Sequence, residues 1–145
     1  MEKAIQSLEA LAAEAGEFVR GLRPRTNEAT LVTLSGELGA GKTAFTKAAA
    51  KALGVEETVT SPTFVLEKIY SLPAGNAFGR LIHIDAYRLE SGAELAPLGF
   101  DELMRAPGNL ILLEWPEKVA DALPEPAKRI LLVPMEDGSR TLTYA

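Results

Sequence analysis

The stretch GELGAGKT, from Gly36 to Thr43, matches the phosphate-binding pattern G-x-x-x-x-G-K-[S/T]. Its glycines let successive backbone N–H groups turn toward one point, and the missing Cβ atoms let phosphate oxygens approach closely. Lys42 is placed to reach the β- and γ-phosphates, and Thr43 to offer a hydroxyl to Mg²⁺. We therefore expect a nucleoside triphosphate to bind through seven successive residues: Glu37, Leu38, Gly39, Ala40, Gly41, Lys42 and Thr43.

The surroundings of this motif are those that a phosphate loop requires. The β-rich run Thr30–Leu34 precedes it, and the Ala- and Lys-rich segment Thr43–Leu53 follows, with Gly54 placed to end a helix. A helix that begins at the loop would direct the positive end of its dipole at the phosphates.

Two carboxylates each follow a predicted strand: Asp85 after residues 81–84 and Glu114 after residues 110–113. If both strands run parallel to the strand before the loop, both acids lie at the edge of the sheet where ligands of open α/β sheets bind. A site for Mg²⁺ and a nucleotide needs such carboxylates.

Roles can be assigned to these residues as expectations. Asp85 would hold Mg²⁺ directly or through water, whereas Glu114 would orient or deprotonate the attacking water, or also bind the metal. The predicted catalytic residues are Lys42, Asp85 and Glu114, and the predicted metal ligands are Thr43, Asp85 and Glu114.

Two neighbours of the acids allow two interpretations each. His83 is the only histidine and shares a strand face with Asp85, so it is either a structural residue or a participant in the chemistry. Trp115 follows Glu114 and either packs in the core or contacts the nucleotide or a partner.

Two further features are equally open. The segment 60–63 suits a loop that senses the γ-phosphate, with Ser61 or Thr63 near the metal, or it is a plain turn containing proline. Arg88 either neutralises phosphate charge or forms a surface salt bridge.

The base of the nucleotide is predicted from a missing motif. Guanine-specific sites commonly carry N-K-x-D or T-K-x-D, but the nearest stretch here is E-K-V-A-D at residues 117–121, which has the wrong first residue and the wrong spacing. ATP is therefore the expected nucleotide.

Composition sets the class of protein. A chain of 145 residues with 47% hydrophobic residues predicts one globular domain over residues 1–145. The absence of cysteine excludes a disulfide scaffold and a thiolate metal site. The longest apolar runs are strand-sized, and acidic residues interrupt the N-terminal apolar segment, so we expect no membrane span, no signal peptide and a cytoplasmic location.

The charge balance bears on nucleic acid. The net charge is −5 and no dense run of Lys and Arg occurs, so free nucleic acid is repelled on average. If the protein acts on nucleic acid, we expect it to do so through a partner.

Helices and strands alternate early in the chain and hairpins follow later, which predicts a three-layer α/β domain with a mixed sheet. The expected helices are 4–22, 43–53, parts of 92–105 with breaks at Pro97 and Gly99, and 116–123. The expected strands are 30–34, 63–72, 81–84, 110–113, 130–135 and 141–144, with antiparallel hairpins joining the second to the third and the last two to each other.

Five sequence blocks occur in a fixed order: GELGAGKT at 36–43, SPTF at 61–64, HIDAYRL at 83–89, LGFDEL at 98–103 and LEWPEK at 113–118. In this combination the chain resembles the bacterial TsaE family, the small ATPases of tRNA threonylcarbamoyladenosine synthesis, from about residue 5 to the end.

This resemblance implies a P-loop fold with a mixed sheet, ATP and Mg²⁺ as ligands, and weak hydrolysis by the protein alone. It also implies two partners, TsaB and TsaD, whose complex carries the threonylcarbamoyl group to the adenosine beside the anticodon. The ATP cycle would reset or regulate that complex, and tRNA would be met only indirectly. The matching blocks imply that Lys42 and Thr43 bind phosphate and metal, that Asp85 and Glu114 serve the metal and hydrolysis, and that Trp115 lies near the site.

The chain departs from the family pattern at two positions. Ala86 stands where a bulky residue is common, which affects packing. Ala12 stands where many members carry a threonine near the nucleotide, so a contact from the first helix is not expected.

Two other functions use the same loop. A small-molecule kinase would need a substrate pocket and an arginine-bearing lid, for which residues 86–109 offer Arg88 and Arg105 but little length. A nucleotide-gated binding module would depend on nucleotide binding, with hydrolysis only incidental, and this alternative overlaps the regulatory ATPase.

Overall fold

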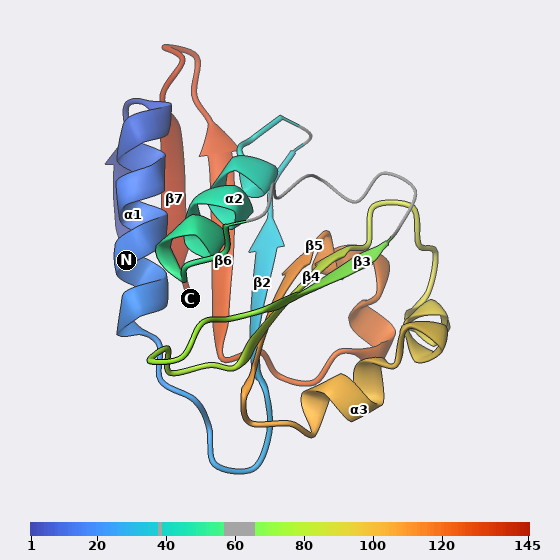
Figure 1. The fold of residues 1–145 in the computed structure, drawn as a ribbon. Helices are drawn as coiled ribbons and strands as arrows, with labels where there is room; N and C mark the ends of the chain where they lie inside the picture. The colour runs from blue at the N-terminus through green and yellow to red at the C-terminus, as the bar shows by residue number, and fades with distance from the viewer. Residues whose placement is uncertain (38, 57–65) are drawn as a thin grey trace.

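The computed structural model describes residues 1–37, 39–56 and 66–145. Within these residues the chain forms one seven-stranded sheet in the order β1-β7-β6-β2-β5-β4-β3 (Figure 1). Strands β6, β2, β5 and β4 are mutually parallel where they pair, whereas β1, β7 and β3 join them in antiparallel pairs. The predicted α/β fold with a mixed sheet is confirmed.

The elements have the following bounds. The strands are β1 Glu2–Ile5, β2 Thr30–Ser35, β3 Glu67–Ser71, β4 Arg80–Asp85, β5 Asn109–Glu114, β6 Lys128–Pro134 and β7 Arg140–Tyr144. The α-helices are α1 Leu8–Gly21, α2 Lys42–Ala52 and α3 Phe100–Met104. The 3₁₀ segments are η1 Gly92–Leu98, η2 Pro116–Lys118 and η3 Ala120–Ala122.

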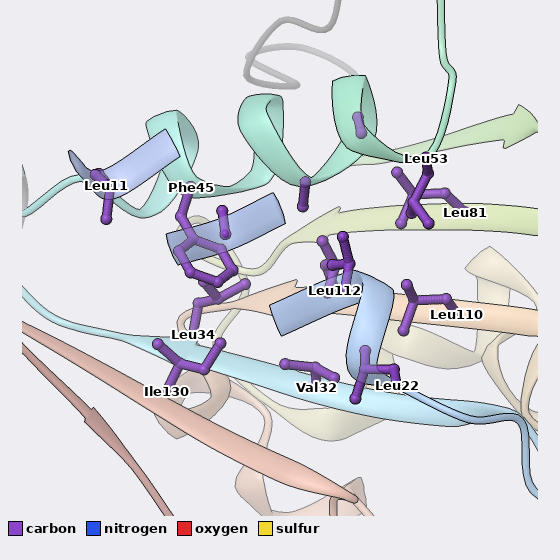
Figure 2. Close-up of a cluster of buried hydrophobic side chains, with 14 of the residues drawn as sticks. Leu11, Leu22, Val32, Leu34, Phe45, Leu53, Leu81, Leu110, Leu112 and Ile130 are labelled. Carbon is purple, nitrogen blue, oxygen red and sulfur yellow. The ribbon is translucent and has the colours of Figure 1, made fainter. Parts of the chain in front are cut away.

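The central strands are mostly buried because helical segments cover both faces of the sheet. All six residues of β5 are buried, as expected of a parallel strand between two neighbours. Helices α1 and α2 lie on one face (Figure 1). There Phe45 of α2 and Leu53, the C-cap of that helix, point toward the strand residues Leu34 and Leu81 (Figure 2).

The opposite face has its own apolar cluster. Leu95 of η1 and Phe100 of α3 pack against Leu31, Ile82 and Ile111, which alternate with the residues of the first cluster along their strands. The sheet therefore lies between two layers of helical segments, which is the predicted three-layer arrangement.

The N-terminal prediction was wrong at its start. The expected helix 4–22 begins at Leu8, because the Ser7 hydroxyl accepts a hydrogen bond from Ala10 N and caps the helix. Residues 2–5 instead form β1, which pairs antiparallel with β7, so Ile5 enters the core from a strand.

The helix predicted over 116–123 is also absent. The chain makes two short 3₁₀ segments, η2 and η3, separated at Val119, whose φ of −131° is incompatible with a helix. Val119 is fully buried in the second apolar cluster, so tertiary packing overrides the local helical pattern.

The remaining expectations largely match. Residues 92–105 form η1 and α3, with Pro97 inside η1 and Gly99 between the two segments. Both predicted hairpins, β3–β4 and β6–β7, are antiparallel. Of the strand predicted over 63–72, residues 63–65 lie outside the described residues. Among the helices that are described, none is long and apolar enough to cross a bilayer.

The central position of β5 predicts a large difference between two apolar truncations. Leu112→Ala removes a fully buried side chain and is expected to lower the free energy of unfolding by about 2–5 kcal/mol. Ile69→Ala on edge strand β3, where Ile69 is 44% exposed, is the matched control and should change it by less than about 1 kcal/mol. Urea unfolding measures both, and equal losses would contradict this description of the core.

Candidate functional site

Strand register brings the loop and the two acids to one edge of the sheet. Leu34 of β2 lies opposite Glu114 of β5, and Asp85 of β4 lies opposite the same Glu114. Both pairings are parallel. Parallel pairing is the condition under which the sequence predicted that the two acids lie at the same edge of the sheet as the loop. The chain from Gly36 to Gly41 leaves the same edge and leads into α2.

The loop adopts backbone conformations that favour glycine. Gly36, Gly39 and Gly41 all have positive φ, at 148°, 83° and 111°. A Cβ on Gly36 would also lie 2.4 Å from the carbonyl oxygen of Leu132, so this position admits no side chain without movement of the backbone. Leu38, one of the predicted nucleotide-binding residues, lies outside the described residues.

The first turn of α2 lacks the capping features of an ordinary helix start. Gly41 is its N-cap, no acidic residue lies in that turn, and within the described ranges no side chain caps it. Uncapped N–H groups and the positive end of the helix dipole together form an anion-binding site.

Lys42 is held inside this loop in the structure. Its ammonium donates hydrogen bonds to the carbonyl oxygens of Gly36 and Glu37, the second at 2.9 Å, and lies 4.1 Å from the ring centroid of Trp115. The side chain is 4% exposed. Its charge is therefore balanced by backbone oxygens and an aromatic face rather than by water.

Burial lowers the pKa of Lys42 below its ordinary value, and the carboxylates of Glu114, Glu117 and Asp85 oppose this shift. The charged form is thus less stable here than in water. An anionic ligand, such as a triphosphate, would stabilise it.

Glu114 is the centre of the polar contacts. It is 2% exposed, and its two oxygens have different partners: Oε1 accepts a hydrogen bond from the Thr43 hydroxyl at 3.4 Å, and Oε2 lies 2.5 Å from His83 Nε2. Asp85 is half-buried, and its Oδ1 accepts a hydrogen bond from the Tyr87 N–H at 3.0 Å. Thr43, Asp85 and Glu114 therefore lie together, as the sequence predicted.

The oxygen set suits Mg²⁺ better than a cation that requires a full protein cage. A hydroxyl and two carboxylates are hard donors, and Mg²⁺ normally keeps several waters and phosphate oxygens besides one or two carboxylates. In the described part of the chain no group of three or more His, Cys, Asp or Glu residues converges as a metal cage.

Trp115 holds an unusual backbone conformation beside the loop. Its φ is 61°, a left-handed value that is unfavourable for a non-glycine residue, and its N–H donates to the Leu34 carbonyl at 3.1 Å. The ring lies 5.0 Å from that of Tyr87, and the Lys118 ammonium lies over Tyr87 at 5.8 Å. The two adjacent rings of Trp115 and Tyr87 thus lie between the ammonium groups of Lys42 and Lys118.

Sequence reasoning missed two residues near the site. Tyr87 lies in the block HIDAYRL, which could have indicated it, but its contact with Trp115 depends on the fold. Arg140 comes from the start of β7, and its Nε would lie 3.1 Å from a Cβ on Gly41, so its guanidinium flanks the loop. No local sequence signal links residue 140 to residue 41.

Three further candidates and the kinase alternative have different outcomes. Arg88 is exposed on the surface. Ser61 and Thr63 lie outside the described residues, so their expected role stays a prediction. Residues 92–104 pack against the face opposite α2, through Leu95 and Phe100, and do not cover the loop as a kinase lid would.

Comparison with known proteins shows the family. A family model described as "Threonylcarbamoyl adenosine biosynthesis protein TsaE" matches residues 5–142. The chain belongs to the TsaE family. The resemblance drawn from the five sequence blocks is therefore confirmed.

Individual TsaE relatives agree with this membership. The tRNA threonylcarbamoyladenosine biosynthesis protein TsaE of Treponema pallidum (strain Nichols) is 41% identical over 120 residues, covering 81% of this chain and 83% of the relative. The protein of the same name from Bacillus subtilis (strain 168) is 38% identical over 117 residues, covering 79% of this chain and 68% of the relative. The crystal structure of Bacillus subtilis YdiB matches with a TM-score of 0.79 at 29% identity, over 99% of this chain and 83% of that one.

The loop geometry predicts that two glycines differ in their tolerance of alanine. Gly39→Ala meets no atom within 4 Å among the described residues and carries only the left-handed strain, about 1–2 kcal/mol. Gly36→Ala adds the clash with Leu132 and should lower the free energy of unfolding by about 1–3 kcal/mol more. Urea unfolding of both variants measures the difference, and equal destabilisation would contradict the described loop.

Proposed function

We propose that this TsaE-family protein binds ATP with Mg²⁺, hydrolyses it slowly, and thereby regulates the complex that makes threonylcarbamoyladenosine in tRNA. The observation that carries the proposal is the meeting of Lys42, Thr43 and Glu114 at an uncapped helix N-terminus. The TsaE names of the relatives support the process, and the geometry of the loop supports the chemistry.

The loop would bind the phosphates through its backbone, Lys42 and Arg140. Backbone N–H groups of residue 37 and residues 39–43, with the N-terminus of α2, would supply hydrogen bonds and a partial positive charge. Lys42 would exchange the carbonyls of Gly36 and Glu37 for phosphate oxygens, which restores the stability of its charged form. Arg140 adds a second positive charge beside Gly41.

Thr43, Asp85 and Glu114 would hold Mg²⁺, which when bound neutralises charge on the phosphates. Glu114 has a second possible task, because a buried carboxylate at this position can orient or deprotonate the water that attacks the γ-phosphate in line. Lys42 would stabilise the charge that develops on the phosphate oxygens. These interactions position the reactants and supply electrostatic stabilisation without a covalent intermediate.

The proposed partners are TsaB and TsaD, with tRNA reached only through their complex. A net charge of −5 argues against direct binding of free tRNA, because phosphate contacts supply most nonspecific affinity for nucleic acid. Slow hydrolysis by the protein alone would follow if the partner complex orders or completes the site. The TsaB–TsaD complex would then respond to whether this protein has ATP bound.

Replacement of Lys42 tests phosphate binding. Lys42→Ala removes a charge-assisted contact and should weaken Mg-ATP binding by about ten- to a hundredfold, measured by calorimetry. Lys47→Ala on the exposed side of the same helix is the matched control and should bind as the wild type does. In a reconstituted reaction with TsaB, TsaD and tRNA, Lys42→Ala should not support repeated rounds of modification. If it does, the proposed function is wrong.

Replacement of Glu114 separates binding from hydrolysis. ATP turnover is measured with and without the TsaB–TsaD complex, and we expect the complex to stimulate the wild type. Glu114→Ala should bind ATP but lose turnover by about 10²-fold or more, because general-base catalysis contributes that much. Persistent tRNA modification by this variant would mean that binding alone suffices, and equal wild-type rates with and without the complex would contradict regulation by partners.

A further inference from the structure

The only histidine of the chain lies beneath the proposed site. His83 is fully buried, and its Nε2 lies 2.5 Å from Glu114 Oε2. Its other ring nitrogen, Nδ1, is also buried and meets no hydrogen-bond partner within the described ranges. Among the described residues, the imidazole of His83 therefore makes one polar contact, through Nε2, and that contact is with Glu114.

Strand geometry explains why these two residues meet. Leu81, His83 and Asp85 alternate along β4 and point to the face that α2 covers. Glu114 on β5 lies opposite Asp85, so it is the diagonal neighbour of His83 on that same face. A histidine at this position can reach the carboxylate from below, whereas Thr43 reaches it from the side of the loop.

Each oxygen of the Glu114 carboxylate has its own side-chain partner. Because Oε2 faces His83 and Oε1 faces Thr43, rotation of the Glu114 carboxylate would break both contacts. A nearly buried carboxylate with only one fixed oxygen could turn away from the phosphates. The contact with His83 removes that freedom, as second-layer hydrogen bonds do at metal and catalytic sites.

We propose that His83 is a positioning residue that orients the Glu114 carboxylate toward the phosphate loop. The proposal rests on the proposed ATP hydrolysis, in which Glu114 acts. This positioning role needs a proton donor only at Nε2. If position 83 served core packing alone, leucine would suit it better, because leucine leaves no buried nitrogen without a partner. Leucine does occupy the other buried positions on this face, Leu81, Leu110 and Leu112.

Two substitutions test this role, because Gln and Asn carry the same amide group on side chains of different length. His83→Gln can place an N–H close to the position of Nε2, whereas the shorter amide of His83→Asn ends near Nδ1 and cannot reach Glu114. We expect His83→Asn to lower kcat for ATP by about 10- to 100-fold with little change in ATP affinity. His83→Gln should keep kcat within about threefold of the wild type, because it restores the donor.

Two controls separate positioning from a general loss of structure. Leu81→Val lies two residues earlier on the same buried face and should change thermal stability without the loss in kcat. In a Glu114→Ala background, the difference between the Gln and Asn variants at position 83 should vanish, since the residue that His83 positions is gone. Equal kcat for the two amide variants, or a difference that persists in the Glu114→Ala background, would overturn the proposal.

A readout without catalysis tests the contact itself. Because the chain has one histidine, nitrogen NMR of its imidazole ring is assigned without ambiguity. We expect a proton on Nε2, none on Nδ1, and a hydrogen-bonded Nε2–H signal that Glu114→Ala abolishes. A proton on Nδ1 instead, or a signal unchanged by Glu114→Ala, would overturn the proposal even if no variant could be compared kinetically.

The two failures can be told apart. If the wild type never hydrolyses ATP, with or without the partner complex, the proposed function fails, while the NMR signal still decides whether His83 holds Glu114. If the wild type hydrolyses ATP and both amide variants match it, the proposed function stands and only the role of His83 fails.

Discussion

The parallel alignment of β2, β5 and β4 is the constraint on which the site depends. Because Leu34, Asp85 and Glu114 occupy matching register positions, one loop and two carboxylates from distant parts of the chain meet at one edge. A shift of register by one residue would turn each acid to the opposite face of the sheet. The buried apolar residues that alternate with these positions fix the register, so the core and the site are specified by the same pairing.

The site also contains several features that are energetically unfavourable on their own. A lysine is buried with its pKa lowered, a carboxylate is nearly fully buried, and Trp115 takes a left-handed conformation. Such features persist only where the surrounding structure holds them, and they concentrate at functional sites. Here the apolar layers on both sides of the sheet supply that support. The energetic consequence is that a bound polyanion would relieve one of these costs, that of the buried Lys42 charge.

Sequence alone predicted the parts of this arrangement that are local or that follow from strand direction. The loop motif identified Lys42 and Thr43 because their chemistry depends on adjacent residues. Asp85 and Glu114 followed from their place at strand ends. The contact between His83 and Glu114 was beyond reach, since a diagonal neighbour is defined only once the register is known.

The elements that sequence missed share a dependence on distant residues. Strand β1 exists because β7, at the other end of the chain, offers it a partner, while its residues also fit a helical pattern. The helix expected after Pro116 gives way because Val119 is drawn into the core. Arg140 reaches the loop because β7 begins beside Gly41 in space. In each case a long-range contact outweighs a local preference.

The most direct test of the account is a titration of the loop amides by NMR. Mg-ATP is added to the labelled protein, and the N–H signals of Gly39, Gly41 and Lys42 are followed, with adenosine as the control that lacks phosphate. The account predicts large, saturable shifts of these three signals with Mg-ATP and none with adenosine. Unchanged loop signals while ATP binds elsewhere, or the same shifts with adenosine, would contradict it.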